Sequence, residues 1–231
     1  MNKKGILYGV GVGPGDPELL TLKALRLLRE ADVVAVPDRG SGEMTAYGIV
    51  KEHIADKPIL RCPTPMTRDA AALEVAYNGI SLRLRALLDD GKNVVFITLG
   101  DPTVYSTYVY VHERVVAMGY EARLVPGVTS FCAAAARIGV PLCERSERLL
   151  IVPASYGVRD ALEADANKVF MKAGSGIAEL RDALRDAGKL EYAHAVENCG
   201  MPGERVFENL EGLEDSGYYS IIIVKDAGVG S

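Results

Sequence analysis

The sequence predicts an α/β protein of two lobes with mainly parallel sheets, the second lobe ending in antiparallel strands. Three observations indicate this class. Short apolar segments alternate with segments of helical period along the chain. Some of these short segments are apolar throughout, as expected of strands covered on both faces. The last two strand-like segments, 204–209 and 219–225, have no helix between them and therefore predict an antiparallel pair.

In the first lobe, Asp16-Pro17-Glu18 supplies an N-cap, a proline at the first helical position and an early acid. The helix that follows has apolar residues at helical spacing, Leu22 among them, and is expected to end near Ala31. We expect further helices at 44–54 and 69–88, and strands at 6–12, 33–36 and 93–99. Met118-Gly119-Tyr120 ends a helix, which places the domain boundary between Ala117 and Glu121.

The predicted domains are therefore residues 1–118 and 119–231. In the second, helices are expected from Thr129 and at 158–164 and 177–187. The expected strands are 122–125, 149–153, 168–171, 192–196, 204–209 and 219–225.

Composition limits the possible functions. Of 231 residues, 48% are apolar and 25% charged, which favours a folded chain over a disordered one. The net charge of -5 gives no general attraction for nucleic acid. No stretch approaches the roughly 20 apolar residues of a membrane-spanning helix, and the chain starts without a long apolar leader. We therefore expect a cytoplasmic protein that binds neither membrane nor nucleic acid.

The cysteines and histidines predict no metal site. None of the four cysteines lies in a C-x-x-C pair, and the three histidines lack metal-ligand spacing. The cysteines are instead expected to be reduced, buried small hydrophobes. They are Cys62, Cys132, Cys143 and Cys199.

Three strand-to-helix loops have unusual compositions, and ligands of α/β sheets bind at the carboxyl ends of strands. The first, residues 9–16, is rich in glycine but matches neither the dinucleotide fingerprint nor a P-loop. Glycines here would let the backbone approach a ligand closely, while Pro14 stiffens the turn. A tight connection capped by Asp16 explains the same residues.

The second and third loops, 99–107 and 126–130, carry hydroxyl side chains near expected helix starts. Asp101-Pro102 could simply begin a helix, although this does not explain the hydroxyls that follow. Thr129 and Ser130 could satisfy first-turn amides or hold the carboxylate of a ligand, which a helix N-terminus favours. Each loop by itself is a weak signal.

Taken together, the motifs resemble those of the tetrapyrrole methylases, in the same order. The first is Gly11-Val12-Gly13-Pro14-Gly15-Asp16-Pro17, continuing to Ala24. The second and third are Leu99-Gly100-Asp101-Pro102 and Val125-Pro126-Gly127-Val128-Thr129-Ser130. Val169-Phe170-Met171 and Ala195-Val196-Glu197-Asn198 are similar to two later motifs, so the resemblance extends over about residues 5–225.

Within that family, the segment from Leu99 to Tyr108 is similar to the carbon-20 methylases of precorrin-2 and cobalt-precorrin-2. Pro65-Met66-Thr67-Arg68-Asp69 also resembles this subgroup. The uroporphyrinogen enzymes carry a glycine-arginine-glycine stretch where this chain has Ser106-Thr107-Tyr108, so the role of that arginine has no counterpart here.

The resemblance implies a homodimer that binds S-adenosyl-L-methionine between two lobes and releases S-adenosyl-L-homocysteine. Matched motif by motif, the residues implied to bind the cofactor are Pro14, Gly100, Asp101, Val104, Thr129, Ser130, Met171 and Ala195. The tetrapyrrole substrate carries many carboxylates, for which arginine is the natural partner. Its expected contacts are Arg39, Arg68 and Tyr105. For each arginine, a solvated surface charge is the alternative.

No catalytic base is identified. Asp38, Tyr105, His112 and Glu113 could remove a proton from carbon 20, but their spacing selects none of them. Alternative functions are methyl transfer by the same fold to another ring carbon, to ribosomal RNA ribose or to a modified histidine. A non-catalytic module that binds an adenosyl ligand is the alternative from another class.

Overall fold

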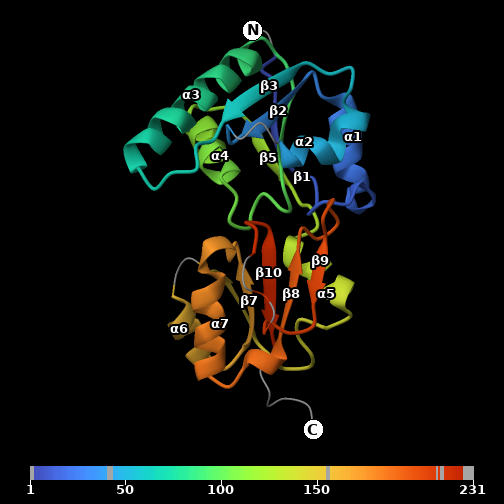
Figure 1. Ribbon diagram of the computed structural model, residues 1–231. Coiled ribbons are helices and arrows are strands. Elements are labelled where there is room, and N and C mark those ends of the chain that lie inside the picture. The colour runs from blue at the N-terminus through green and yellow to red at the C-terminus, as the bar shows by residue number, and fades with distance from the viewer. Residues whose placement is uncertain (1–2, 41–43, 155–156, 212, 214–215, 226–231) are drawn as a thin grey trace. The chain divides into compact units, whose positions relative to one another are not determined.

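The computed structural model describes residues 3–40, 44–154, 157–211, 213 and 216–225, and divides into two compact units (Figure 1). The units are Met1–Thr129 and Ser130–Ser231. The boundary predicted between 117 and 121 was therefore about ten residues too early. Strand β5 (Ala122–Val125), expected to open the second lobe, pairs with β1 (Leu7–Gly11) in the first.

The first unit is built on a five-stranded parallel sheet in the order β3-β2-β4-β1-β5. Its other strands are β2 (Val33–Asp38), β3 (Ile59–Pro63) and β4 (Val94–Thr98). Because every strand runs in the same direction, all five carboxyl ends lie along one edge of the sheet. The loops singled out from the sequence leave the sheet at that edge.

Helices cover both faces of this sheet. The helices are α1 (Leu22–Glu30), α2 (Thr45–Val50), α3 (Ala70–Asp89) and α4 (Tyr108–Ala117), with short 3-10 turns at Pro17–Leu19 and Lys51–His53. Alternate residues of β2 enter different cores, as strand geometry requires. Val34 and Val36 pack with α1 and α2, whereas Val33 and Ala35 pack with α3 and α4.

One local prediction for the first unit was wrong, and one strand was missed. The single helix expected after Asp16 is two elements: Asp16 caps the 3-10 turn, and Thr21 caps α1 by accepting from Ala24 N at 3.1 Å. The restart leaves Leu22 87% exposed instead of on the apolar face. Strand β3 was not predicted because it is an edge strand, mostly exposed, that follows Pro58 and ends with Pro63.

The second unit contains a mixed sheet in the order β6-β7-β10-β8-β9. Only β6 and β7 pair in parallel, so the second sheet is mixed, whereas the first is parallel throughout. The antiparallel ending is confirmed, but β9 and β10 do not pair with each other. Instead β10 lies between β7 and β8, antiparallel to both, and β9 pairs with β8.

The second unit contains five strands, three helices and two 3-10 turns among its described residues. The strands are β6 (Leu149–Pro153), β7 (Asn167–Met171), β8 (Ala193–Glu197), β9 (Arg205–Phe207) and β10 (Ser220–Val224). The helices are α5 (Ser130–Ile138), α6 (Val158–Glu163) and α7 (Ile177–Asp186), with 3-10 turns at Gly174–Gly176 and Leu190–Tyr192.

Two further observations concern the chain's surface. All four cysteines are free, but Cys132 and Cys143 are exposed, contrary to the prediction that all four are buried. In the described part of the chain, no helix is both long enough and apolar enough to cross a membrane.

Candidate cofactor and substrate site

Three loops meet at the carboxyl edge of the first sheet, after the adjacent strands β4, β1 and β5. Gly100 N donates to Gly13 O at 2.7 Å, and Gly13 N donates to Gly100 O at 3.3 Å. The third loop is equally close, because a Cβ atom added to Gly11 would lie 2.7 Å from Gly127 N. Gly11 and Gly127 therefore have to be glycine for the three backbones to come together.

Asp101 joins the second loop to the third. Its side chain is nearly buried, with 8% of the residue exposed. Oδ1 accepts hydrogen bonds from Thr103 N at 2.8 Å and Thr103 Oγ1 at 2.5 Å, while Oδ2 accepts from Gly127 N at 3.0 Å. Because protein donors occupy both oxygens, the carboxylate acts as a brace. Because the carboxylate is occupied, the contact of Asp101 with the cofactor is expected from its backbone, and it stays a prediction.

Asp101→Asn is expected to weaken binding of S-adenosyl-L-homocysteine about tenfold, because an amide cannot accept from both sides of this brace. With the asparagine oxygen towards Thr103, its NH2 group faces the Gly127 N–H, and two donors meet. Isothermal calorimetry would measure the affinity, and circular dichroism would check the fold. Unchanged affinity would show that the brace does not shape the ligand site.

Thr129, in the third loop, has a hydroxyl oxygen that is buried yet lacks a hydrogen-bond partner among the described residues. An unsatisfied buried hydroxyl is costly, so it favours a ligand that supplies the missing bond. Pro14 and Gly100 are also buried at this edge, and Val104 is half-buried. Glycine backbone, small apolar walls and an unused hydroxyl fit an adenosyl cofactor, which needs apolar packing and a few fixed polar groups.

The predicted substrate residues lie along the same edge, farther from β5. Arg39 follows β2, Arg68 lies between β3 and α3, and both are exposed. The two segments are tied together because Thr64 N donates to the carbonyl of Asp38 at 2.7 Å. Tyr105 stands in the β4–α4 loop and is 48% exposed. The edge thus carries a glycine-lined part near β1 and a part with exposed arginines near β2 and β3.

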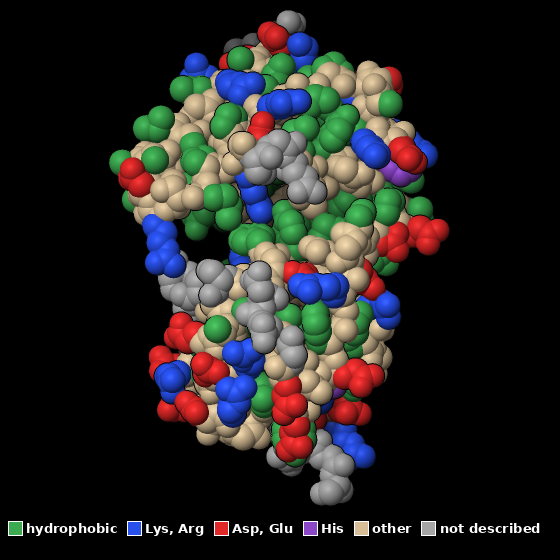
Figure 2. Space-filling view, in the orientation of Figure 1, with side chains coloured by type: hydrophobic (Ala, Val, Ile, Leu, Met, Phe, Trp, Pro, Cys, Tyr) green, Lys and Arg blue, Asp and Glu red, His purple; other side chains and the backbone are tan. Residues whose placement is uncertain are grey.

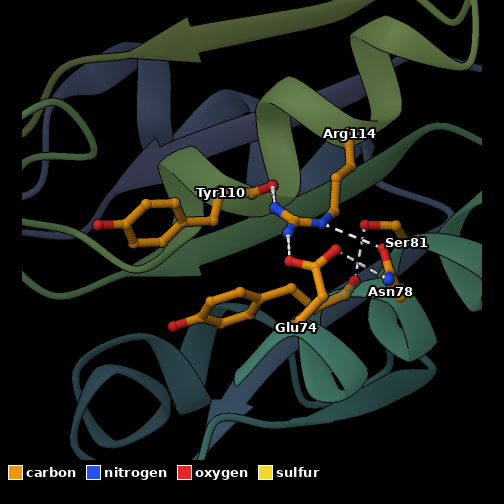
Figure 3. Close-up of polar contacts among 6 residues, drawn as sticks. Glu74, Asn78, Ser81, Tyr110 and Arg114 are labelled. Atoms are coloured by element: carbon orange, nitrogen blue, oxygen red, sulfur yellow. Dashed lines mark hydrogen bonds and ion pairs between the residues drawn. The ribbon is translucent and has the colours of Figure 1, made fainter. Parts of the chain in front are cut away.

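Helix α4, which follows the second loop, is fixed against α3 by a polar network (Figure 3). Arg114 forms an ion pair with Glu74, donates from Nε to Asn78 Oδ1 at 3.1 Å and donates to Tyr110 O at 2.7 Å. The guanidinium also lies 5.6 Å from the centre of the Tyr77 ring. These contacts hold the helix in place and therefore hold one end of the second loop.

The proposed bases are not equally placed. His112 lies one turn inside α4, where Tyr108 OH and His112 Nδ1 lie 3.3 Å apart. Burial lowers the pKa of His112 and raises that of Tyr108. Asp38 and Tyr105 lie at the loop edge, and Asp38 Oδ1 already accepts from Gly40 N at 2.9 Å. Glu113 is exposed on α4. No one of the four is singled out as the base.

Three of the predicted cofactor residues belong to the second unit. Ser130 begins α5, Met171 ends β7 with 9% of the residue exposed, and Ala195 lies buried in the middle of β8. Met171 is followed by Lys172 with φ 59, an uncommon conformation for this residue type. The structure brings Pro14, Gly100, Asp101, Val104 and Thr129 together within the first unit.

A model of one family, the Tetrapyrrole (Corrin/Porphyrin) Methylases, matches residues 6–214. The chain is a member of this family. It is 33% identical to a cobalt-precorrin-2 C(20)-methyltransferase of Salmonella typhimurium, covering 95% of this chain and 96% of that one. It is 30% identical to a precorrin-2 C(20)-methyltransferase of Sinorhizobium, covering 95% of each.

Solved structures of other tetrapyrrole methylases share the fold. A cobalt precorrin-4 methyltransferase superposes with a TM-score of 0.77 at 22% identity, covering 95% of this chain and 94% of that one. A uroporphyrin-III C-methyltransferase of Thermus thermophilus, complexed with S-adenyl homocysteine, gives a TM-score of 0.70 at 27% identity. That match covers 96% of this chain and 98% of the other.

Sequence reasoning named Asp101 but not Ser106 among the side chains that shape the loops of this tetrapyrrole methylase. Ser106 was read only as one of several hydroxyls, yet its Oγ lies 2.9 Å from Thr98 Oγ1 and accepts from Tyr108 N at 3.2 Å. The one signal available was a serine two residues before the start of a helix, a position from which its side chain commonly accepts from a backbone amide of the first turn.

Proposed function

We propose that this protein transfers a methyl group from S-adenosyl-L-methionine to carbon 20 of precorrin-2 or cobalt-precorrin-2 in cobalamin biosynthesis. The observation that carries the proposal is the meeting of Gly11, Gly100 and Gly127, in loops that include Thr129, whose buried hydroxyl has no hydrogen-bond partner among the described residues. The two relatives named for this reaction cover nearly the whole chain and support the choice of substrate. No described group of three or more His, Cys, Asp or Glu residues is arranged to hold a metal ion.

The chemistry requires alignment more than a strong protein nucleophile. When bound, the cofactor supplies an electrophilic methyl group, and an electron-rich ring carbon accepts it as the carbon–sulfur bond breaks. Its sulfur would depart as a neutral thioether, and the proton displaced from carbon 20 would pass to one of the candidate bases or to water. The protein's part is to hold the two reactants in line and exclude water. Backbone hydrogen bonds between Gly13 and Gly100, and the bond from Gly127 N to the Asp101 carboxylate, connect the loops and support this role.

The cofactor is proposed to contact Pro14, Gly100, Asp101, Val104 and Thr129 of the first unit, mostly through backbone. Ser130, Met171 and Ala195 of the second unit complete the predicted set. Arg39 and Arg68 are proposed to bind carboxylates of the macrocycle. Bidentate arginine–carboxylate pairs fix orientation as well as adding affinity, which suits a reaction that must select one carbon of a large ring.

A cytoplasmic homodimer completes the proposal. Helix α3 supports self-association because apolar residues recur on its exposed face at spacings of three and four, as at a helix–helix interface. Val75 is 73% exposed and Leu82 is 50% exposed, and Ala72, Gly79 and Ala86 lie on the same exposed stripe. Figure 2 shows hydrophobic side chains gathered over α3. Light scattering of the purified protein would give the number of subunits.

Mass spectrometry of the reaction product tests the proposed function. The protein is incubated with S-adenosyl-L-methionine and either metal-free or cobalt-loaded precorrin-2, in parallel. We expect one of the two rings to gain a single methyl group while S-adenosyl-L-homocysteine accumulates. Turnover of the cofactor only with RNA or peptide would favour another acceptor. Binding without any turnover would favour a non-catalytic module.

A further inference from the structure

Tyr105 adopts a backbone conformation that large side chains rarely take. Its φ is 47°, in the left-handed region, and it is one of four described non-glycine residues with positive φ. For a bulky residue this conformation costs stability and persists only where the surroundings impose it. The side chain is also 48% exposed, so burial of the ring offsets only part of that cost.

Hydrogen bonds on both sides impose the conformation of Tyr105. Before it, Asp101 holds Thr103 and Gly127, and Val104 N donates to Asp101 O at 3.4 Å. After it, Ser106 Oγ shares a hydrogen bond with Thr98 and accepts from Tyr108 N. Thr98 is the last residue of β4, so the second anchor is tied directly to the sheet. The loop is therefore built to place residue 105 and cannot relax around it.

The position of the ring suggests what it is placed for. Tyr105 lies between the Asp101 brace, on the glycine-lined side of the edge, and the start of α4. The arginines proposed for the substrate suit its peripheral carboxylates. A macrocycle also has a broad apolar face, which a charged side chain does not match. An exposed aromatic ring on an anchored stretch of backbone matches such a face by stacking.

We propose that Tyr105 is a substrate-positioning residue whose aromatic face stacks on the tetrapyrrole ring and sets its plane for methyl transfer. The strained backbone is the cost of placing the ring at this point of the edge. This inference rests on the proposed function and adds a specific role to it: the arginines recognise the edge of the macrocycle, and Tyr105 recognises its face.

Two substitutions of Tyr105 separate this role from a purely local one. Tyr105→Gly removes the ring and relaxes the backbone, so we expect tetrapyrrole affinity to fall about tenfold. At the same time Tm should rise by roughly 1–3 °C, because glycine adopts positive φ without strain. Tyr105→Phe keeps the ring and should bind the tetrapyrrole within about twofold of wild type. All affinities are measured by absorbance titration with precorrin-2.

The matched control is Arg145→Gly. Arg145 also has positive φ, 49°, but lies in an exposed loop of the second unit. Its replacement should raise Tm by a similar amount and leave tetrapyrrole affinity unchanged. Calorimetry with S-adenosyl-L-homocysteine accompanies each variant, and its affinity should stay within about threefold of wild type.

Wild-type tetrapyrrole affinity in Tyr105→Gly would overturn the inference, as would an equal loss in Tyr105→Phe, which would assign the effect to the hydroxyl. A fall in Tm for Tyr105→Gly would show that the conformation is not strained and would overturn the argument from strain. If wild type binds S-adenosyl-L-homocysteine but neither ring form, the proposed substrate is wrong. In that case the role of Tyr105 fails together with the substrate.

Discussion

Gly127→Ala is expected to lower the affinity for S-adenosyl-L-homocysteine about a hundredfold. A Cβ atom at this position would lie 2.7 Å from the carbonyl carbon of Gly11 and would overlap the carbonyl oxygen of Gly100. Both neighbours are backbone, so the clash can be relieved only if the loops move apart. The movement would also stretch the bond from Gly127 N to Asp101. Calorimetry measures the affinity, and a thermal melt measures the accompanying loss of stability.

Gly48→Ala is the control for this variant. It adds the same methyl group to the same unit, on the exposed side of α2, where an added Cβ atom would meet nothing within 4 Å. Because alanine favours helix, stability should rise by about 0.5–1 kcal/mol. Cofactor affinity should not change. If Gly127→Ala behaves like Gly48→Ala, the three loops do not form the cofactor site.

Arg68→Ala is expected to raise the dissociation constant of the tetrapyrrole by roughly ten- to a hundredfold. A charge-assisted hydrogen bond contributes about 1.5–3 kcal/mol, and the exposed Arg68 is proposed to make such a bond to a ring carboxylate. The affinity should also depend less on salt once the ion pair is gone. Arg68→Lys should recover only part of the loss, because it keeps the charge but not the bidentate geometry. Absorbance titrations at low and high salt provide the measurement.

Arg26→Ala is the matched control for Arg68. Arg26 is also an exposed arginine of the first unit, but it lies on α1 and pairs with Glu30 on the same helix. Its replacement should leave tetrapyrrole affinity unchanged. Affinity for S-adenosyl-L-homocysteine should stay within about threefold of wild type in the Arg68 and Arg26 variants. A tetrapyrrole affinity of Arg68→Ala equal to that of Arg26→Ala would show that Arg68 is a solvated surface charge.

Local sequence patterns predicted the elements that local forces determine. Strands β1 and β4 are apolar along their length because helices cover both faces of their sheet, and both were expected. Strand β3 was missed because an exposed edge strand needs no apolar pattern. The place of β10 between β7 and β8 depends on pairing between distant segments, which spacing along the chain does not reveal.

The same division applies to the site. Glycine density and the Gly-Asp-Pro turn indicated which loops meet at the carboxyl edge and are proposed to bind a ligand, because a close backbone approach requires those residue types. The partners of Asp101 could not be read in the same way. Gly127 lies 26 positions later, and only the pairing of β1 with both β4 and β5 brings the two loops together. The cap at Thr21 was local, but Asp16-Pro17 offered an equally good start five residues earlier.

The position of the transferred methyl group tests the central claim most directly. The protein is incubated with S-adenosyl-L-methionine labelled with ¹³C in its methyl group, together with metal-free and cobalt-loaded precorrin-2 in separate reactions. Carbon NMR of the product should show a single enriched methyl group attached to carbon 20 of the ring form that turns over. A label on any other ring carbon, or no label on either ring, would contradict the assignment of this chain as a carbon-20 methyltransferase.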